Sequence, residues 1–462
     1  MNPRILRVLD GAVLALALLA ALVVARDDAG LRGPWLIIAL VATVPLYLVG
    51  RGWRLPWWAH AVAASLPVSL VLVALAHGYG DGAARATRFG YGALLALALM
   101  AWARSPRRRL AAGLGVAVLV ADQYITAWFP WWGGGDPTKL MWGSFYWHNP
   151  FAAYLVIGIA VAAFIAVAGR RMFAVLGFLV TFLAGAGVVA SGSRASLVLL
   201  GGVLLVAVAA GAAARRWAGL ARGLALPVGI AVTAVVMTGP IFFPVADATG
   251  DAVGGLTGRT QPAGKSVVER FLFWGDALRL GAGSPVTGIG LQAFGRALQC
   301  ERDTALTSHP HNEYLLAWAE GGALAAIPML AVLVGIVWLV FVSVVRAPEP
   351  AARRVRWLPG GAELREDPAR WGALLGLVVA AGHAAFDFDW AYPALLALTG
   401  IVGGIAAAPL MASRPSASRG VAAVNLVLVA VLLGAGVAGC LVDPVPGESL
   451  RPLTPGVYVC PE

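Results

Sequence analysis

The chain has 462 residues, of which 60% are hydrophobic and only 12% are charged, whereas an ordinary soluble domain is roughly 45–50% apolar and about 25% charged. No soluble core could bury that much apolar surface, so lipid must solvate much of the chain. This composition excludes a cytosolic enzyme, a nucleic-acid-binding module and a disordered protein. The net charge of +11 is then informative mainly through the positions of the basic residues.

Apolar runs recur along the whole chain, and each is long enough, or nearly so, to cross a hydrocarbon layer of ~30 Å as a helix. The sequence therefore predicts an all-α polytopic membrane protein with about 12–13 transmembrane helices and one long, partly helical extracytoplasmic loop. The runs lie at 11–25, 35–50, 57–76, 89–103, 110–129, 150–168, 172–190, 196–214, 223–243, 322–345, 371–385, 391–412 and 421–440.

The basic residues predict the orientation, because Lys and Arg near helix ends are retained on the cytoplasmic side. One set of alternate loops holds 21 of the 34 Lys and Arg residues, and six of the other 13 lie in one long segment, 244–310. We therefore expect transmembrane helices over 1–243 with a cytoplasmic N-terminus, an extracytoplasmic catalytic loop at 244–312, further transmembrane helices over 313–440 and an extracytoplasmic tail at 441–462. A short helix is expected in the loop at 267–280.

The three cysteines, Cys300, Cys440 and Cys460, form no CxxC pair and no cluster with histidine at metal-ligand spacing, so no structural zinc or iron–sulfur site is expected. All three fall on the predicted outer side, where oxidation is permitted. Cys440 and Cys460 either form a bridge or remain two thiols.

Two arginines lie in polar segments on the predicted outer side. Arg194 interrupts two apolar runs within residues 191–196 (SGSRAS), where it could either snorkel to headgroups or donate two parallel hydrogen bonds to a phosphate. Arg270 lies in residues 269–274 (ERFLFW), where it could form a salt bridge with Glu269 or Asp276 or bind an anion. The nearby Gly288 and Gly290 lack the spacing of a dinucleotide-binding motif.

The segment 307–314 (TSHPHNEY) precedes an apolar run. Asn312 is a plausible N-cap, and a helix that starts there would direct its N–H groups at an anionic ligand. His311 would then lie beside a phosphate site. An imidazole titrates near neutrality unless its surroundings shift it, so His311 is suited to take a proton from a hydroxyl. A structural role for His309 and His311 is the alternative.

Two aromatic segments complete the candidate set: residues 145–155, which include His148, Asn149 and Tyr154, and residues 383–390 (HAAFDFDW). Aromatic belts at the membrane interface explain the tryptophans and tyrosines without any further function. A carboxylate at the end of an apolar helix needs a partner, so Asp387 could orient a histidine or pair with an arginine.

Together these segments resemble the O-antigen ligase and O-antigen polymerase superfamily of bacterial envelope glycosyltransferases. The resemblance spans roughly residues 145–390, in the order of the family. The matching pieces are Phe151-Ala152-Ala153-Tyr154-Leu155 after an Asn, the SGSR turn ending at Arg194, Arg270 with Trp274 and Gly288-Ile289-Gly290, His311-Asn312 with Gly322, and His383 with Asp387.

The resemblance implies transfer of a glycan from a polyprenyl-pyrophosphate carrier to an acceptor hydroxyl, at the outer face of the bacterial cytoplasmic membrane, without a cofactor or an essential metal. Arg194 and Arg270 would hold the diphosphate and His311 would be the base. The substrate-binding residues would be Asn312, His309, Arg279, Asn149, His148, Tyr154, Asp387 and His383.

Three alternatives remain open from the sequence. The acceptor could be a lipid, a glycan or a protein, and ligase-like transfer is favoured narrowly over polymerisation. A different class, a transporter or flippase of lipid-linked glycan, would place its ionisable residues near the bilayer midplane on broken helices. Here the candidate residues cluster at one predicted rim.

Overall fold

The computed structural model describes residues 3–442 except 27–32, 78–83, 134–139, 146, 239–262, 302–306, 308, 346–360, 388 and 413–417. This described part is helical and contains no strand. In chain order its helices are α1 (Pro3–Arg26), α2 (Gly33–Val49), η2 (Gly52–Arg54), α3 (Trp57–Ala76), α4 (Ala84–Trp102), α5 (Pro106–Gly133), α6 (His148–Ala168), α7 (Arg171–Ser191), α8 (Arg194–Thr238), α10 (Ala263–Gly283), α11 (Phe294–Glu301), α12 (Glu313–Val345), α13 (Gly361–Glu366), α14 (Pro368–Ala384), η3 (Asp389–Ala391), α15 (Pro393–Ala412) and α16 (Arg419–Val442).

Every apolar run predicted from the sequence overlaps one of these helices, which confirms the all-α membrane fold. Among the described residues, nine helical segments are long and apolar enough to cross a membrane, and two shorter apolar segments lie at Trp35–Val49 and Arg419–Ala435. Several helices begin before the predicted apolar runs. Helix α12 begins at Glu313 and not at 322, and α4 begins at Ala84 and not at 89, so that it includes the buried Arg85 and Arg88.

The run at 196–214 and the described part of the run at 223–243 both fall in α8, which folds back on itself. A Cβ atom at Gly223 would lie 2.7 Å from the Cα atom of Val208, although 15 residues of straight helix would separate them by about 22 Å. Gly211 and Gly219 also meet backbone to backbone. The two halves of α8 are therefore antiparallel and packed through small residues.

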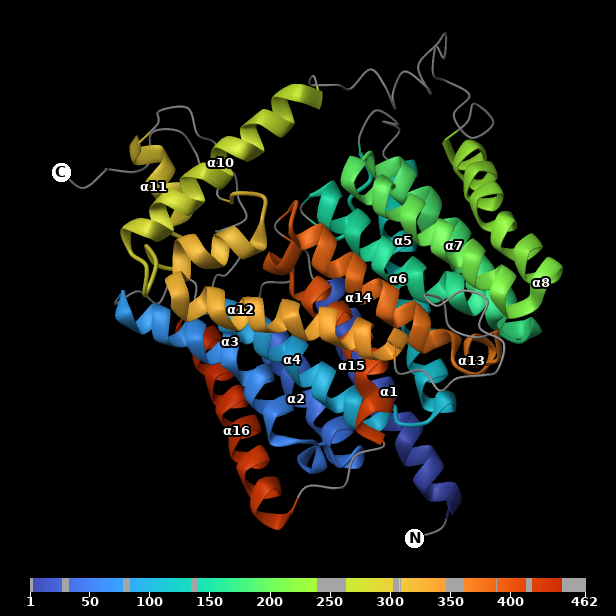
Figure 1. Ribbon diagram of the computed structural model, residues 1–462, viewed down its shortest axis with the longest axis horizontal. Coiled ribbons are helices and arrows are strands. Elements are labelled where there is room, and N and C mark those ends of the chain that lie inside the picture. The colour runs from blue at the N-terminus through green and yellow to red at the C-terminus, as the bar shows by residue number, and fades with distance from the viewer. Residues whose placement is uncertain are drawn as a thin grey trace.

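Helix α6 is the centre of the bundle. Every residue from Pro150 to Ala168 is buried, and α6 contacts α5, α7, α8, α14 and α15. A helix that is apolar on all sides must be enclosed by others, and the ring of neighbours supplies that enclosure (Figure 1). The ends of α7, α8 and α14, which carry candidate residues, are positioned by their packing on or beside α6.

Helix α12 is bent at Gly322, whose φ of 53° and ψ of −150° are not helical. The break frees backbone groups, and the segment after α10 pairs with them. Ile289 N–H donates to Ala319 O (2.9 Å), and Leu324 N–H donates to Val286 O (3.1 Å). A Cβ atom at Gly322 would lie 2.6 Å from the Gly288 nitrogen. The predicted glycine motifs around residues 288 and 322 therefore pack against each other at this bend.

The predicted helix at 267–280 is confirmed, since it lies within α10. Figure 1 shows α10 and α11 together at one end of the molecule, on the opposite side from the N-terminus. Leu316 and Ala319 of α12 join Ala277, Phe294 and Leu298 in a small apolar cluster that holds this pair of helices against the bundle. Residues 244–262, 302–306 and 308 of the predicted loop, the tail beyond Val442 and the question of a Cys440–Cys460 bridge lie outside the described residues.

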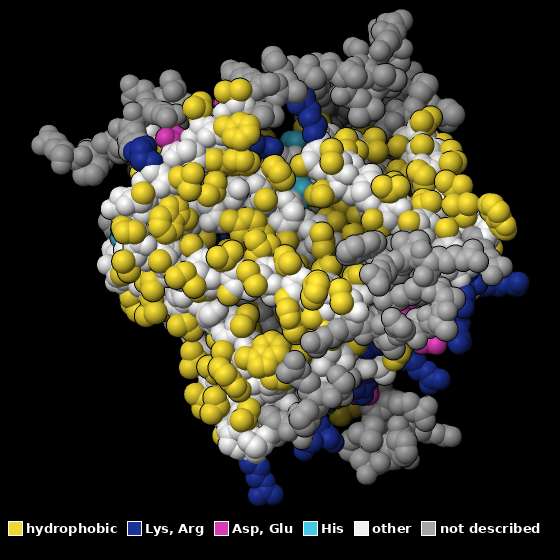
Figure 2. Space-filling model, viewed as in Figure 1, with side chains coloured by type: hydrophobic (Ala, Val, Ile, Leu, Met, Phe, Trp, Pro, Cys, Tyr) yellow, Lys and Arg dark blue, Asp and Glu magenta, His cyan; other side chains and the backbone are white. Residues whose placement is uncertain are grey.

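Hydrophobic side chains cover most of the face drawn in Figure 2. Lys and Arg side chains gather along its lower edge, and a smaller group that includes histidine appears near the upper edge. An apolar band between two polar edges is what a bilayer-spanning protein presents.

Candidate active site

The connection from α14 to α15 is the structural centre of the candidate site. It begins with His383 in the last turn of α14, continues through Phe386 and Asp387, and enters η3 at Asp389. His383, Phe386 and Asp387 each contact a different segment of the chain.

His311 contacts the α14–α15 connection through Asp387. Its Nδ1 atom lies 3.1 Å from Asp387 Oδ1, and the two side chains are 23% and 1% exposed. An ionised carboxylate only accepts hydrogen bonds, so Nδ1–H donates to it and Nε2 is the basic nitrogen. His311 also has a φ of 53°, a region that side-chain-bearing residues rarely adopt and that is often found at functional sites.

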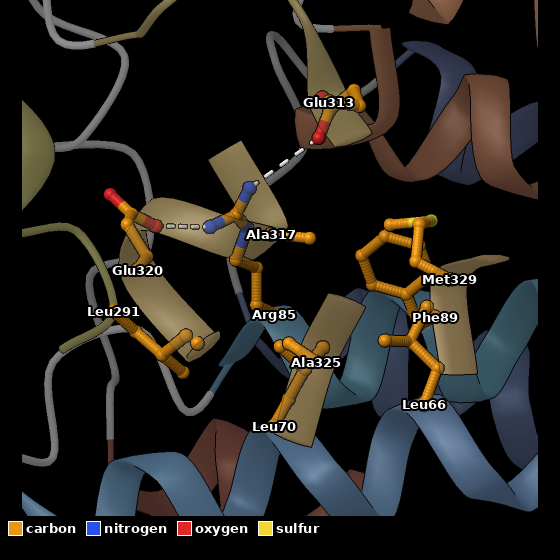
Figure 3. A pocket seen from close by; sticks show the side chains of 11 residues that line it. Leu66, Leu70, Arg85, Phe89, Leu291, Glu313, Ala317, Glu320, Ala325 and Met329 are labelled. Carbon is orange, nitrogen blue, oxygen red and sulfur yellow. Dashed lines mark hydrogen bonds and ion pairs between the residues drawn. The ribbon is translucent and has the colours of Figure 1, made fainter. Parts of the chain in front are cut away.

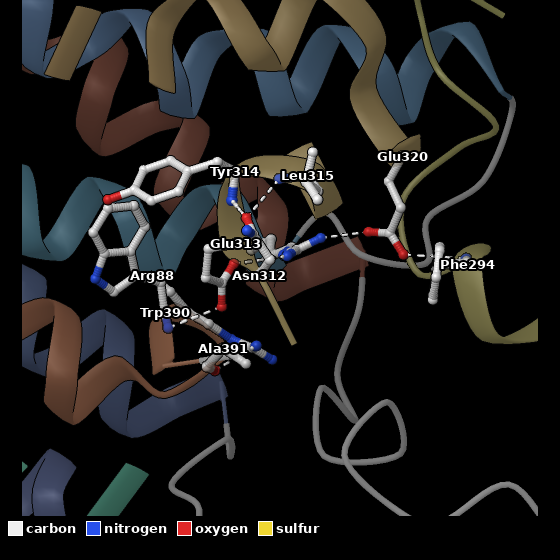
Figure 4. A network of polar contacts seen from close by, with 10 residues as sticks. Arg88, Phe294, Asn312, Glu313, Tyr314, Leu315, Glu320, Trp390 and Ala391 are labelled. Carbon is white, nitrogen blue, oxygen red and sulfur yellow. Dashed lines mark hydrogen bonds and ion pairs between the residues drawn. The ribbon is translucent and has the colours of Figure 1, made fainter. Parts of the chain in front are cut away.

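Asn312 is the N-cap of α12, as predicted. Its Oδ1 atom accepts the backbone N–H groups of Tyr314 and Leu315, each at 3.0 Å (Figure 4). Before it, the Thr307 hydroxyl accepts from His309 N–H and donates to His309 O (3.2 and 2.7 Å). Burial, followed by the charge of Arg85, lowers the pKa of His309 to about 3. This histidine is therefore neutral at physiological pH.

Arg194 is the first residue of α8 and is exposed. Gly192, with a φ of 66°, ends α7 in the left-handed region, and the N–H of Ser193 donates to the Ser191 hydroxyl (3.2 Å). The hydroxyl oxygen of Ser196, two residues after Arg194, lies 2.9 Å from His383 Nε2. This contact ties the start of α8 to the α14–α15 connection.

Arg270 lies on α10 one turn before Trp274, whose ring packs 6.2 Å from that of Phe386 between centroids. The salt bridge predicted as an alternative for Arg270 is not present. Asp276 instead pairs with Arg279 at 3.4 Å. In the part of the chain that the structure describes, neither Arg194 nor Arg270 forms an ion pair, so their charges are not offset by a neighbouring carboxylate.

Three residues predicted to bind substrate lie in the interior instead. Tyr154 is 1% exposed and packs against Phe145, with ring centroids 5.4 Å apart. His383 and Asp387 are 0% and 1% exposed. Direct substrate contact by these three side chains stays a prediction, and their burial favours a role for Asp387 and His383 in holding other residues of the site.

The other predicted substrate-binding residues are at least partly accessible. His148 and Asn149 are half-buried at the start of α6, and the carboxylate of Asp387 interacts electrostatically with His148. Arg279 is 53% exposed in its ion pair with Asp276. His309 and Asn312 are half-buried beside His311.

A buried ionic cluster under the site was not predicted. Arg85 donates to Glu320 and lies 3.4 Å from Glu313. Figure 3 shows its guanidinium between the two carboxylates, at a small pocket whose other lining residues are mainly apolar. The sequence signal was the spacing of Glu313 and Glu320, seven residues apart, which places both on one face of a helix.

The same two carboxylates also hold neighbouring backbone (Figure 4). Glu313 accepts Trp390 N–H at 2.9 Å, and Glu320 accepts Phe294 N–H at 3.2 Å. Arg88 donates to Ala391 O at 2.8 Å. The start of α12 is thereby joined to η3 and to the start of α11, so the cluster supports the segment that carries His311.

The fold is that of a multi-pass α-helical membrane protein, in which the segments that carry Arg194 and Arg270 and the side chain of His311 each contact the α14–α15 connection. Residues 179–330 match the family model described as O-antigen ligase. This match, which contains Arg194, Arg270 and His311, covers about a third of the chain and supports the predicted resemblance to the O-antigen ligase and polymerase superfamily. No curated protein matches the chain.

Proposed function

We propose that this protein transfers a glycan from a polyprenyl-pyrophosphate-linked donor to an acceptor hydroxyl, in the manner of an O-antigen ligase. The site would face outward from the cytoplasmic membrane of a bacterium, with the basic edge of the bundle inside. The single observation that supports the proposal best is the α14–α15 connection. His383 contacts the segment of Arg194, Phe386 contacts the segment of Arg270, and Asp387 contacts His311 itself.

The location at an outer rim favours a lipid-linked donor. Nucleotide sugars are made in the cytosol, so an outward-facing site needs a sugar already carried across the membrane on a lipid. Such a donor presents a diphosphate at the level of the headgroups. Guanidinium groups bind phosphate oxygens through two parallel hydrogen bonds, and Arg194 and Arg270 lack a carboxylate competitor among the described residues.

In the proposed reaction, the acceptor hydroxyl oxygen attacks the anomeric carbon of the donor while His311 Nε2 takes the hydroxyl proton. The bond between the anomeric carbon and the phosphate oxygen breaks, and its electron pair stays on the polyprenyl diphosphate. Direct displacement inverts the anomeric configuration. Asp387 would hold the neutral tautomer of His311 and stabilise the imidazolium that forms, and the two arginines would stabilise the leaving diphosphate.

The test is a transfer assay with the purified protein in liposomes and a chemically defined polyprenyl-pyrophosphate oligosaccharide. A lipid, a second lipid-linked glycan and a protein are offered as acceptors in turn, and the products are identified by mass. The proposal predicts a covalent product with at least one acceptor, release of polyprenyl pyrophosphate, and activity that survives EDTA because fixed arginine charges stabilise the leaving group. Movement of labelled donor across the bilayer with no covalent product would instead identify a transporter.

A further inference from the structure

A buried chain of hydrogen bonds runs from the α7–α8 turn to η3. The Ser193 hydroxyl donates to that of Ser196 at 3.1 Å, and Ser196 Oγ lies 2.9 Å from His383 Nε2. His383 Nδ1 lies 2.6 Å from Asp389 Oδ2. These four side chains are between 0% and 2% exposed. They are thus sequestered from solvent and from any ligand.

The directions of the hydrogen bonds follow from the chemistry of the groups. An ionised Asp389 only accepts, so His383 carries its proton on Nδ1 and offers a lone pair at Nε2. Ser196 then donates to Nε2, and its oxygen accepts from Ser193. With a neutral imidazole, each of these hydrogen bonds has one donor and one acceptor. This chain of hydrogen bonds, here called the relay, consists of Ser193, Ser196, His383 and Asp389. It therefore specifies one arrangement of α8 against α14.

The order Ser–His–Asp is that of a hydrolase triad, but a nucleophilic role does not fit. Ser196 is 0% exposed, and its oxygen already accepts from Ser193. A nucleophile must reach a substrate carbonyl or phosphorus atom. The relay therefore acts on its neighbours in the fold and not on a substrate.

We propose that Ser196, His383 and Asp389 are positioning residues that place Arg194 relative to His311; this inference rests on the proposed function. Arg194 precedes Ser196 by two residues at the exposed end of α8, whereas Asp387, which holds His311, follows His383 by four. The relay thus connects the segment of Arg194 to the segment that holds His311, the proposed base, through one short stretch of chain.

The consequence is a dependence of Arg194 on a hydroxyl that never touches substrate. In Ser196→Ala the first turn of α8 loses its bond to α14, so the guanidinium is displaced. A displacement of about 1 Å at a reacting group can cost on the order of 10²-fold in rate. We expect S196A to lower kcat/KM for the lipid-linked donor by roughly ten- to hundredfold. The KM for the acceptor should stay near the wild-type value.

The experiment compares R194A, S196A and the double variant R194A/S196A in the transfer assay, with S343A as the matched control. The Ser343 hydroxyl is also buried and accepts from Arg370 at 3.1 Å, but it lies at the far end of α12. We expect the double variant to be no slower than R194A, because side chains that act as a unit are not additive. S343A should transfer at the wild-type rate.

A second variant covers the case in which S196A fails to insert. In D389N the side chain keeps its shape, but its amide can donate to Nδ1 and move the imidazole proton to Nε2, which then opposes the Ser196 hydroxyl. D389N should weaken inhibition by polyprenyl pyrophosphate, the probe for the diphosphate site, to a similar extent as S196A. An unchanged inhibition constant in a folded D389N protein would overturn the relay.

The outcomes separate the two proposals. Wild-type activity in R194A would show that the proposed role of Arg194 is wrong, and the relay would fall with it. A slow R194A, together with losses that multiply in R194A/S196A or with a fully active S196A, would overturn the relay alone. A thermal midpoint unchanged in S196A would show that the kinetic loss is not a loss of folded protein.

Discussion

The Asp387 carboxylate lies directly against the imidazole of His311, with Oδ1 3.1 Å from Nδ1 and with the carboxylate almost fully buried while the imidazole reaches the surface. This pairing fixes which nitrogen of His311 faces outward. In the proposed reaction, this outward nitrogen would take the proton from the acceptor hydroxyl.

Asp387→Asn tests this pairing with little change in shape. The neutral amide cannot stabilise the imidazolium, so kcat should fall by about tenfold or more, with the roughly 10²–10⁴-fold that a general base contributes as the upper limit. Because substrate binding does not use Asp387 directly, the KM values should change less than kcat. Initial rates at saturating donor measure this, with size-exclusion chromatography to show that the variant is folded. A kcat within about twofold of wild type would contradict the role of Asp387.

Arg194→Ala and Arg270→Ala should each lower kcat/KM by about a hundred- to a thousandfold, which corresponds to ~2.7–4 kcal/mol of transition-state stabilisation. Lysine at either position should restore part of the activity, since it keeps the charge but not the paired hydrogen bonds. Arg107→Ala is the matched control, because Arg107 is exposed at the other end of the bundle, at the start of α5. An R107A protein as slow as R194A would mean that loss of any surface arginine impairs the enzyme.

Arg85→Ala should destabilise the protein, because it leaves Glu313 and Glu320 buried without their cation. Removal of one partner of a buried ion pair typically costs about 3–5 kcal/mol. The double variant R85A/E320Q removes one of the orphaned charges and should recover part of the thermal midpoint in detergent. An R85A midpoint equal to that of wild type would show that the cluster does not stabilise the start of α12.

The pKa of His309, about 3 in the folded protein against an ordinary 6.5, predicts acid sensitivity. Between these two values the unfolded chain binds a proton that the folded protein does not, so stability falls as the pH drops from about 6.5 towards 3. His309→Gln removes this titration, and its thermal midpoint should fall less between pH 7 and pH 5 than that of wild type. Parallel curves for the two proteins would contradict the neutral state of His309.

The sequence predicted those features that depend on local chemistry. Hydropathy located the membrane helices because a helix in lipid needs an apolar exterior over its whole length. The N-cap at Asn312 was predictable because its two partners, Tyr314 and Leu315, are only two and three residues away. The resemblance to the superfamily then ordered the remaining motifs along the chain.

The buried polar contacts could not be predicted, because their partners are distant in sequence. Ser196 and His383 are 187 residues apart, and Arg85 and Glu320 are 235 apart. The local sequence around each of these residues does not indicate which distant polar residue it will contact. The burial of Tyr154 follows from its place on α6, a helix that is apolar on all sides and enclosed by other helices.

The most direct test of the central claim is the mass of the product formed by wild type and by His311→Ala from one defined polyprenyl-pyrophosphate oligosaccharide and one hydroxyl acceptor. The account predicts that wild type yields the acceptor plus the intact oligosaccharide, with inverted anomeric configuration. It also predicts that folded H311A still binds the donor but forms this product about 10²–10⁴-fold more slowly. An H311A protein that transfers glycan at the wild-type rate would contradict the account.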